Sequence, residues 1–157
     1  MKIEFTPKLI MIDDARIIFR NFSGRPGPYN REGERNFAVV IPTQEIADAL
    51  MEEGYNVKIK APRDPDDTPL MHLPVKVGFN QYGPTCYLVS GKKRVPLDEE
   101  SVGILDKIDI LSVNMDIRPY DWNRNGDSGR SCWLQSIEVH QRLDRFAERY
   151  AEEELEG

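Results

Sequence analysis

The sequence predicts a mainly β domain with peripheral helices, and three observations lead to this fold class. Apolar and polar residues alternate with a period of two in several short segments, which is typical of half-buried strands. Gly- and Pro-rich turns separate these segments, and few stretches show helical periodicity. A length of 157 residues fits one domain with a single core.

About seven strands are expected from these alternating or β-rich segments. The clearest alternation runs from Leu111 to Ile117, where apolar residues face one side and Ser112, Asn114 and Asp116 face the other. Enrichment in β-branched and aromatic residues marks segments that alternate less strictly. The other expected strands cover residues 16–22, 37–41, 55–60, 75–79, 86–90 with a return through 94–97, and 131–140.

Three helices fit between and after the strands. Thr43 can cap a helix that Gly54 ends, because a threonine hydroxyl accepts a first-turn N–H and glycine adopts the left-handed conformation that stops a helix. Acidic residues 98–100 favour the start of a short helix that reaches residue 108, where they suit the helix dipole. The third helix begins near Arg142 and presents Leu143, Phe146 and Tyr150 on one stripe.

The resulting order is two strands, a helix, three strands, a helix, two strands and a final helix. A parallel sheet would require a helix after each strand, so this order favours an antiparallel arrangement. We predict a small antiparallel Greek-key barrel, similar to an OB-fold, with a C-terminal helix. The expected organisation is a β-rich domain at 1–141 followed by a C-terminal helix and acidic tail at 142–157.

Charge is distributed unevenly along the chain. The formal net charge is −6, but the final seven residues hold four glutamates and no basic residue. Without this tail, 21 basic residues face 23 acidic ones, which leaves room for a basic groove on the body. No apolar run approaches the roughly 20 residues of a membrane helix, and the N-terminus does not resemble a signal peptide. Cys86 and Cys132 lack CxxC spacing, so we expect free thiols and a cytoplasmic protein.

Two polar segments combine arginines with aromatic residues and are predicted to be long loops. The first runs from Ser23 to Asn36 and the second from Arg118 to Ser131. Cations neutralise phosphates and flat rings stack on bases, so this combination is typical of single-stranded nucleic-acid binding. The candidate binding residues are Arg20, Arg25, Tyr29, Arg31 and Arg35 around the first loop, Arg118, Tyr120, Trp122, Arg124 and Arg130 in the second, and Lys58, Lys60 and Lys76 on the polar faces of two strands.

The second loop partly imitates a calcium-binding loop. Asp121, Asn123, Asn125 and Gly126 match the first, third, fifth and sixth EF-hand positions, but Cys132 stands where the bidentate glutamate is needed. A weak ion site stays open, and an Asn-Gly turn is the preferred interpretation.

No complete catalytic site is expected. The segment GDSG at 126–129 is similar to a serine-protease nucleophile segment, but Arg130 replaces the next glycine and only His72 lies upstream. The scattered aspartates form no nuclease pattern, and the sequence has no glycine-rich phosphate loop. We therefore predict no catalytic residues, no metal ligands and no cofactor.

The chain resembles the single-stranded DNA-binding proteins of tailed bacteriophages. The similarity lies in ARIIFRNF with its Gly/Pro loop, in RNFAVVIP, and in the closing RFAERYAEEELEG. The resemblance implies an OB-fold with a basic groove, single-stranded DNA as the partner, and a non-catalytic role in replication or recombination in the host cytoplasm. It also implies that a tail binds replication or recombination proteins, here through Glu152, Glu153, Glu154 and Glu156.

An alternative function belongs to a different class. The exposed loops and acidic surface are also compatible with a module that binds or inhibits a host or phage protein. On the nucleic-acid hypothesis, Tyr120 and Trp122 are displayed for stacking, whereas Trp133 lies within a strand and is structural. The sequence does not indicate an oligomeric state.

Overall fold

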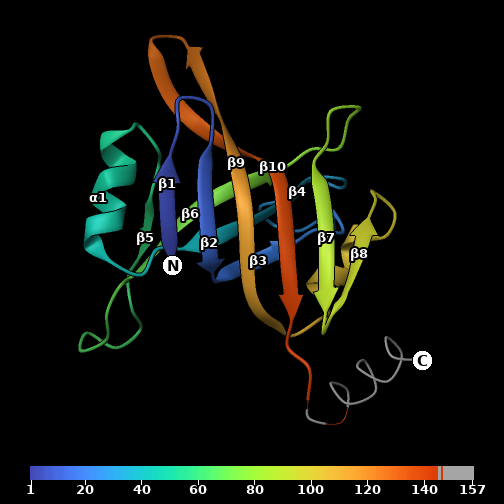
Figure 1. The fold of residues 1–157 in the computed structure, drawn as a ribbon. Helices are drawn as coiled ribbons and strands as arrows, with labels where there is room; N and C mark the ends of the chain where they lie inside the picture. The colour runs from blue at the N-terminus through green and yellow to red at the C-terminus, as the bar shows by residue number, and fades with distance from the viewer. Residues whose placement is uncertain (145, 147–157) are drawn as a thin grey trace.

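The computed structural model describes residues 1–144 and 146 and contains a single large sheet with one α-helix (Figure 1). No helix in this described part is long and apolar enough to cross a membrane. The elements in chain order are β1 (Lys2–Phe5), β2 (Ile10–Ala15), β3 (Ile17–Asn21), β4 (Arg35–Val40), α1 (Gln44–Glu52), β5 (Lys58–Lys60), β6 (Leu70–Val77), β7 (Thr85–Ser90), β8 (Lys93–Leu97), the 3₁₀ helix η1 (Val102–Asp106), β9 (Ile110–Arg124) and β10 (Asp127–Gln141).

The sheet closes on itself because β2 and β3 form one bent strand. Its strand order is β1-β2-β9-β10-β6-β4-β3, so β2 and β3 lie toward opposite ends of that order. Only Arg16 separates the two strands, and its carbonyl oxygen accepts a hydrogen bond from the N–H of Val40 on β4 (2.9 Å). The bent strand, β4, β6, β10 and β9 therefore surround one core, and Figure 1 shows β4 and β6 crossing behind β2 and β9. This five-stranded arrangement confirms the predicted OB-like β fold.

Strand β10 lies at the centre of the sheet, and the two parallel strand pairings of the sheet both involve it. It pairs antiparallel with β9 along almost its whole length, and parallel with β6 at Trp133 and Lys76. Beyond that point its C-terminal half pairs in parallel with β7, which forms a hairpin with β8 outside the barrel. The other strand pairings are antiparallel, as predicted, and these two parallel contacts were not expected.

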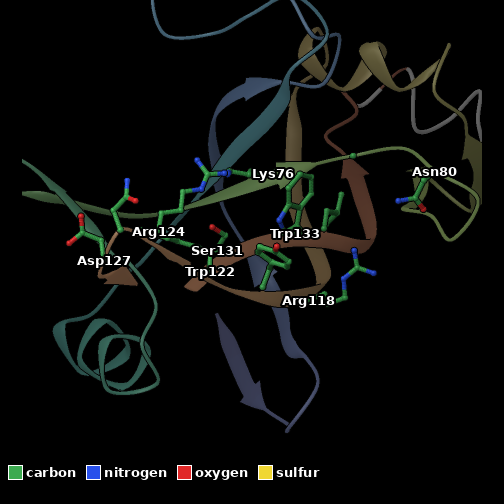
Figure 2. Close-up of a pocket in the computed structure, with 12 residues that line it drawn as sticks. Lys76, Asn80, Arg118, Trp122, Arg124, Asp127, Ser131 and Trp133 are labelled. Carbon is green, nitrogen blue, oxygen red and sulfur yellow. The ribbon is translucent and has the colours of Figure 1, made fainter. Parts of the chain in front are cut away.

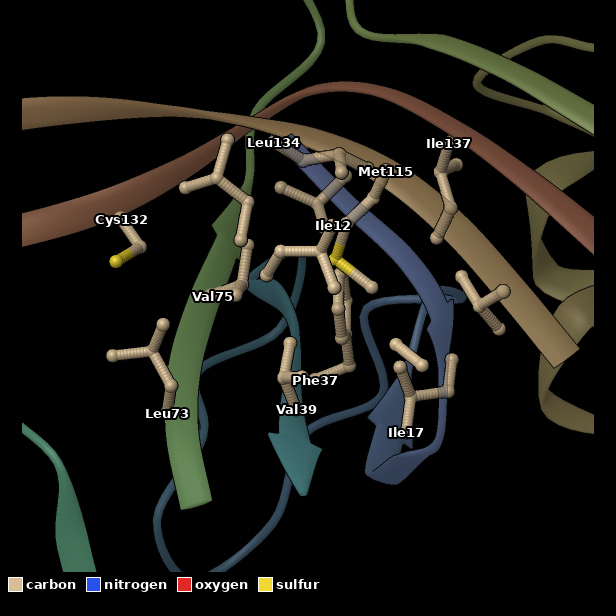
Figure 3. Close-up of a cluster of buried hydrophobic side chains, with 14 of the residues drawn as sticks. Ile12, Ile17, Phe37, Val39, Leu73, Val75, Met115, Cys132, Leu134 and Ile137 are labelled. Atoms are coloured by element: carbon tan, nitrogen blue, oxygen red, sulfur yellow. The ribbon is translucent and has the colours of Figure 1, made fainter. Parts of the chain in front are cut away.

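The core fills the interior of this barrel, and every barrel strand contributes to it (Figure 3). Ile12, Phe37, Val75, Met115 and Leu134 come from the bent strand, β4, β6, β9 and β10, and each is at most 4% exposed. Alternation along each strand directs these side chains inward and leaves the intervening residues on the outer surface. The free, buried thiols of Cys86 and Cys132 confirm that part of the prediction.

Several expected elements are confirmed or corrected. The hydroxyl of Thr43 accepts the N–H of Ile46 (3.2 Å) at the start of α1, and Gly54 follows its end at φ 90°, as predicted. The second expected helix is only the short 3₁₀ helix η1. The described part contains ten strands instead of about seven, because β1, β2 and the short returning strands were missed or merged. Residues 142–144 have no regular secondary structure, and Phe146 is in helical conformation. The other residues of the expected C-terminal helix and its four glutamates lie outside the described residues.

Candidate nucleic-acid interface

The segment from Arg118 to Ser131 is a β-hairpin, so the prediction of a long loop here is wrong. Its two sides are the ends of β9 and β10, paired in unbroken register from Arg118↔Trp133 to Arg124↔Asp127. Asn125 and Gly126 form the turn with φ angles of 51° and 87°. Positive φ at both central residues defines the two-residue turn that best matches the twist of a hairpin. We call residues 118–131 the β9–β10 arm, and Figure 1 shows it projecting beyond the barrel.

Alternation along β9 gives the arm two chemically different faces. Arg118, Tyr120, Trp122 and Arg124 are spaced two residues apart, so their side chains share one face. Tyr120 is 59% exposed and Trp122 is 36% exposed. A hairpin thus presents two cations and two rings as a regular row, which a flexible loop would not do.

This face of the arm forms one wall of a groove of about 850 Å³ (Figure 2). We call it the aromatic groove. Three cationic side chains and one carboxylate line it, so it favours an anionic ligand. Its lining residues are Lys76, Gly78, Asn80, Arg118, Tyr120, Trp122, Arg124, Asn125, Asp127, Ser131, Trp133 and Leu134.

Two glycines create the space in which the two tryptophan rings lie. A Cβ atom on Gly129 would be 2.6 Å from the Trp122 indole, which lies directly across the ladder. A Cβ atom on Gly78 would likewise be 2.8 Å from the indole of Trp133. Real Cβ contacts are not this short, so neither position could hold a side chain with the ring where it is. Each indole therefore packs directly on the backbone of its glycine, which fixes the position of the ring. The Nζ atom of Lys76 lies 5.6 Å from the Trp133 ring centroid, which adds a cation beside the second ring.

The groove continues from the arm onto the barrel along one row of paired residues. Trp133 on β10 pairs with Lys76 on β6, Lys76 pairs with Asn36 on β4, and Asn36 pairs with Asn21 on β3. This row leads from the arm to the β3–β4 loop, residues 22–34. The two segments that the sequence singled out therefore flank the same outer face of β4 and β6.

The β3–β4 loop is extensively hydrogen-bonded. Both the N–H and the carbonyl of Arg25 bond the side chain of Asn21 (2.9 Å each). The Asn30 amide donates to the Arg25 and Glu34 carbonyl oxygens, while its oxygen accepts from Asn36 (2.7 Å). Tyr29 is 99% exposed at the tip of this loop. Arg25 and Arg31, which precede and follow Tyr29 in the sequence, are also exposed, so the loop presents one ring and two cations.

Arg20 and Arg35 belong to the framework and do not line the groove. The Arg20 guanidinium donates to the carbonyl oxygens of Leu105 (2.7 Å) and Ile108 (2.8 Å), which anchors η1 against the barrel. Arg35 donates to the Phe22 carbonyl (2.8 Å) and lies over the Phe79 ring. These contacts occupy both guanidinium groups with the chain's own backbone.

Arg130 lies on the opposite face of the arm from the groove. Its guanidinium makes a bidentate contact with Asp121 (2.7 and 3.2 Å) and donates to the Glu53 carbonyl at the end of α1 (2.8 Å). It also lies over the ring of Tyr55. The hydrogen bond from Arg130 holds the pKa of Asp121 below its usual value. Arg130 therefore supports the base of the arm. Its partner Asp121 is the residue that matches the first position of a calcium-binding loop in the sequence.

The structure also reveals groove residues that the sequence did not indicate. Trp133 was expected to be a structural core residue, but it is only half-buried and lines the groove. Trp133 faces outward between buried Cys132 and Leu134, and a bulge in the β9–β10 pairing near Gln135 then shifts the alternation so that Ile137 is buried as well. Asn80 lies at the far end of the groove on the β6–β7 loop. The alternation of Trp133 with buried Cys132 and Leu134 was the available signal for its outward orientation.

The remaining predicted cations are Lys58 and Lys60 on β5. Both are exposed, and β5 pairs with the start of β6, from Leu70 to His72, whereas Lys76 lies near the end of β6. Within residues 1–144 and 146, no group of three or more His, Cys, Asp or Glu side chains is arranged to hold a metal ion.

Comparison with known families agrees with this geometry. Residues 2–155 match the family model described as "Putative phage ssDNA-binding domain". The chain belongs to this family. Membership in this phage ssDNA-binding domain family confirms the resemblance inferred from the sequence. No curated protein matches the chain by sequence.

Solved structures of phage ssDNA-binding proteins share the fold. The C-terminally truncated single-stranded DNA-binding protein of bacteriophage Enc34 has a TM-score of 0.55 at 13% identity, covering 87% of each chain. The untruncated Enc34 protein gives 0.54 at 11% identity over 93% of each chain. The Enc34 protein in complex with ssDNA gives 0.52 at 13% identity, covering 88% of this chain and 89% of that one. At these identities the similarity establishes the fold.

Proposed function

We propose that this phage ssDNA-binding domain binds single-stranded DNA along the outer face of β4 and β6, between the β3–β4 loop and the β9–β10 arm. The observation that carries the proposal is the aromatic groove, where one face of the arm sets Tyr120 and Trp122 between two arginines. Loops in these positions, and the face between them, bind oligonucleotides in OB-folds generally.

The chemistry of the groove suits single strands and tolerates many sequences. The rings of Tyr120, Trp122 and Trp133 can stack on bases, and every base has a flat face. Lys76, Arg118 and Arg124 can neutralise phosphates, which makes affinity fall as the salt concentration rises. In a duplex the bases stack on one another and their faces are not accessible to these rings, so we expect a preference for single strands.

The β3–β4 loop supplies the second half of the proposed interface. Tyr29, Arg25 and Arg31 are exposed on a loop whose backbone is fixed by the asparagine hydrogen bonds. A fixed loop loses little conformational entropy on binding, so its ring and cations are available at low cost. We propose that these three residues contact the part of the DNA strand that extends past Lys76 and Asn36 toward the β3–β4 loop.

We also propose a role in phage DNA replication or recombination in the host cytoplasm. Glu152, Glu153, Glu154 and Glu156 form an anionic segment that can bind a basic partner protein or compete with phosphate for the groove. Removing the chain after Tyr150 tests the proposed competition between the tail and DNA, because it should tighten DNA binding at low salt. Unchanged affinity would contradict competition by the tail.

We infer that the domain acts without catalysis. The charged groups that line the groove are three cations and Asp127, an arrangement that suits binding of a polyanion and supplies no paired carboxylates. Incubation with labelled single strands and Mg²⁺ should leave them intact, and cleavage that copurifies with the protein through two columns would contradict this inference.

Fluorescence polarisation with labelled oligo-dT tests the proposed binding. The domain should bind oligo-dT at low salt more tightly than a duplex of equal length, and raising the salt should weaken the complex. Absence of oligo-dT binding at low salt would overturn the proposal and favour the protein-binding alternative.

A further inference from the structure

A second exposed ring lies on the outer face of the barrel, away from the aromatic groove. Phe19 on β3 is 53% exposed and has a φ angle of 53°. A bulky residue with positive φ is a backbone outlier, and such outliers concentrate at functional sites. The β3–β4 register shifts between Ile18 and Asn21, so an irregular strand presents this ring.

The surroundings of Phe19 are cationic. The Nζ atom of Lys60 on β5 lies 5.7 Å from its ring centroid, and the ring of His72 on β6 meets it edge-on at 5.3 Å. Lys58 pairs with His72 across the β5–β6 ladder. Nδ1 of His72 is buried and has no hydrogen-bond partner among the described residues. Burial, followed by the charges of the two lysines, lowers the pKa of His72, so the positive charge of this patch comes from the lysines.

Lys58 connects this patch to the aromatic groove. His72 lies four residues from Lys76 on β6, a separation of about 13 Å at about 3.3 Å per residue. A hollow of about 480 Å³ lies between β5 and the arm and contains Lys58 at one side and Lys76 and Trp122 at the other. A single strand of DNA that is bound in the aromatic groove can therefore run past Lys76 and Lys58 and reach Phe19.

We propose that Phe19, Lys58 and Lys60 form a second base-stacking site for single-stranded DNA, a conclusion that rests on the proposed function of the groove. Phe19 offers a ring face to a base, while the long side chains of Lys58 and Lys60 can move onto the adjacent phosphates. A short oligonucleotide binds at the aromatic groove without reaching Phe19, and a longer one spans both sites.

Polarisation titrations with labelled oligo-dT of about 4 and about 16 nucleotides, the range of OB-fold site sizes, test this proposal. Phe19→Ala should weaken binding of the long oligonucleotide roughly five-fold or more and leave the short one unchanged. Lys60→Gln, whose side chain is exposed, should weaken only the long complex and decides the matter if Phe19→Ala does not fold. Ile59→Ala is the matched control, because Ile59 is 61% exposed between the two lysines and alternation directs it away from them.

The outcomes separate this inference from the proposed function. Wild-type affinity of Phe19→Ala for the long oligonucleotide, with Trp122→Ala weakened at both lengths, would overturn the second site and leave the groove standing. Equal weakening of both lengths by Phe19→Ala would also overturn it, since Phe19 would then belong to the first site. Failure of the wild-type protein to bind either length would overturn the proposed function itself.

Discussion

The indole of Trp122 packs on Gly129, its direct partner across the β9–β10 ladder. A Cβ at Gly129 would be 2.6 Å from the six-membered part of the ring and 3.0 Å from its Nε1 atom. The glycine therefore determines where the ring lies, and a ring that is already oriented loses less entropy when it stacks on a base. The indole of Trp133 likewise packs on Gly78, although its ladder partner on β6 is Lys76.

Gly129→Ala should weaken single-strand binding because the added methyl group displaces the Trp122 ring. We expect a loss of about 1–3 kcal/mol of binding free energy, as for Trp122→Ala, which removes the stacking ring altogether. The two changes should not add, because both act through one ring. Titrations of wild type, both single variants and the double variant measure this coupling. Additive losses would show that Gly129 acts independently of Trp122.

Trp122→Ala and Trp133→Ala should differ in their effect on stability. Trp122 and Tyr120 lie on the projecting arm outside the core, so truncating either should reduce DNA affinity and lower the unfolding free energy less than Trp133→Ala does. Trp133 is half-buried against Gly78, so its truncation should lower both affinity and stability. Urea unfolding and polarisation on the same variants separate the two effects. Loss of stability in Trp122→Ala alone would reverse these assignments.

Arg124 and Arg130 should have different effects on salt dependence. Arg124 lines the groove, so Arg124→Ala should reduce the slope of log affinity against log salt by about 0.7 for one lost phosphate contact. Arg130→Ala should leave the slope unchanged and lower stability by about 1 kcal/mol, because its hydrogen bond to the Glu53 carbonyl is lost. Titrations at four salt concentrations and urea unfolding measure both quantities. A reduced slope in Arg130→Ala would place that residue on the DNA.

The cysteines should be unreactive in the folded protein. Burial raises the pKa of Cys86 and of Cys132 to about 12, so neither forms the nucleophilic thiolate at pH 8. A thiol reagent should label them only after unfolding. Since these thiols lose their protons more readily in the unfolded chain, the stability they contribute is complete below about pH 9 and is lost as pH rises toward about 12. Rapid labelling of the native protein at pH 8 would contradict their burial.

Local patterns predicted the barrel strands and the capped helix well. Thr43 and Gly54 delimit α1 through short-range hydrogen bonding and backbone preference, which a single sequence displays. The alternation from Leu111 to Ile117 likewise reflects its half-buried position in β9. The aromatic and cationic composition of the arm was also visible, although polar residues and two glycines made a hairpin look like a loop.

Long-range pairing explains the features that the sequence did not show. Arg20 and Arg130 resemble any exposed arginine in sequence, but their partners are carbonyl groups 85 and 77 residues away. Trp133 alternates with buried Cys132 and Leu134, but its pairing with Lys76 and the bulge near Gln135, which changes the alternation before buried Ile137, do not follow from periodicity. The positive φ of Phe19 is equally invisible in the sequence.

The most direct test of the account is an NMR titration of the ¹⁵N-labelled protein with a short oligo-dT. The account predicts that amide shifts concentrate on residues 118–133, around Lys76 and Asn36, and in the β3–β4 loop, while α1 and the β7–β8 hairpin are unaffected. Shifts concentrated on α1 or on the β7–β8 hairpin, with residues 118–133 unchanged, would contradict the assignment of the aromatic groove as the DNA-binding site.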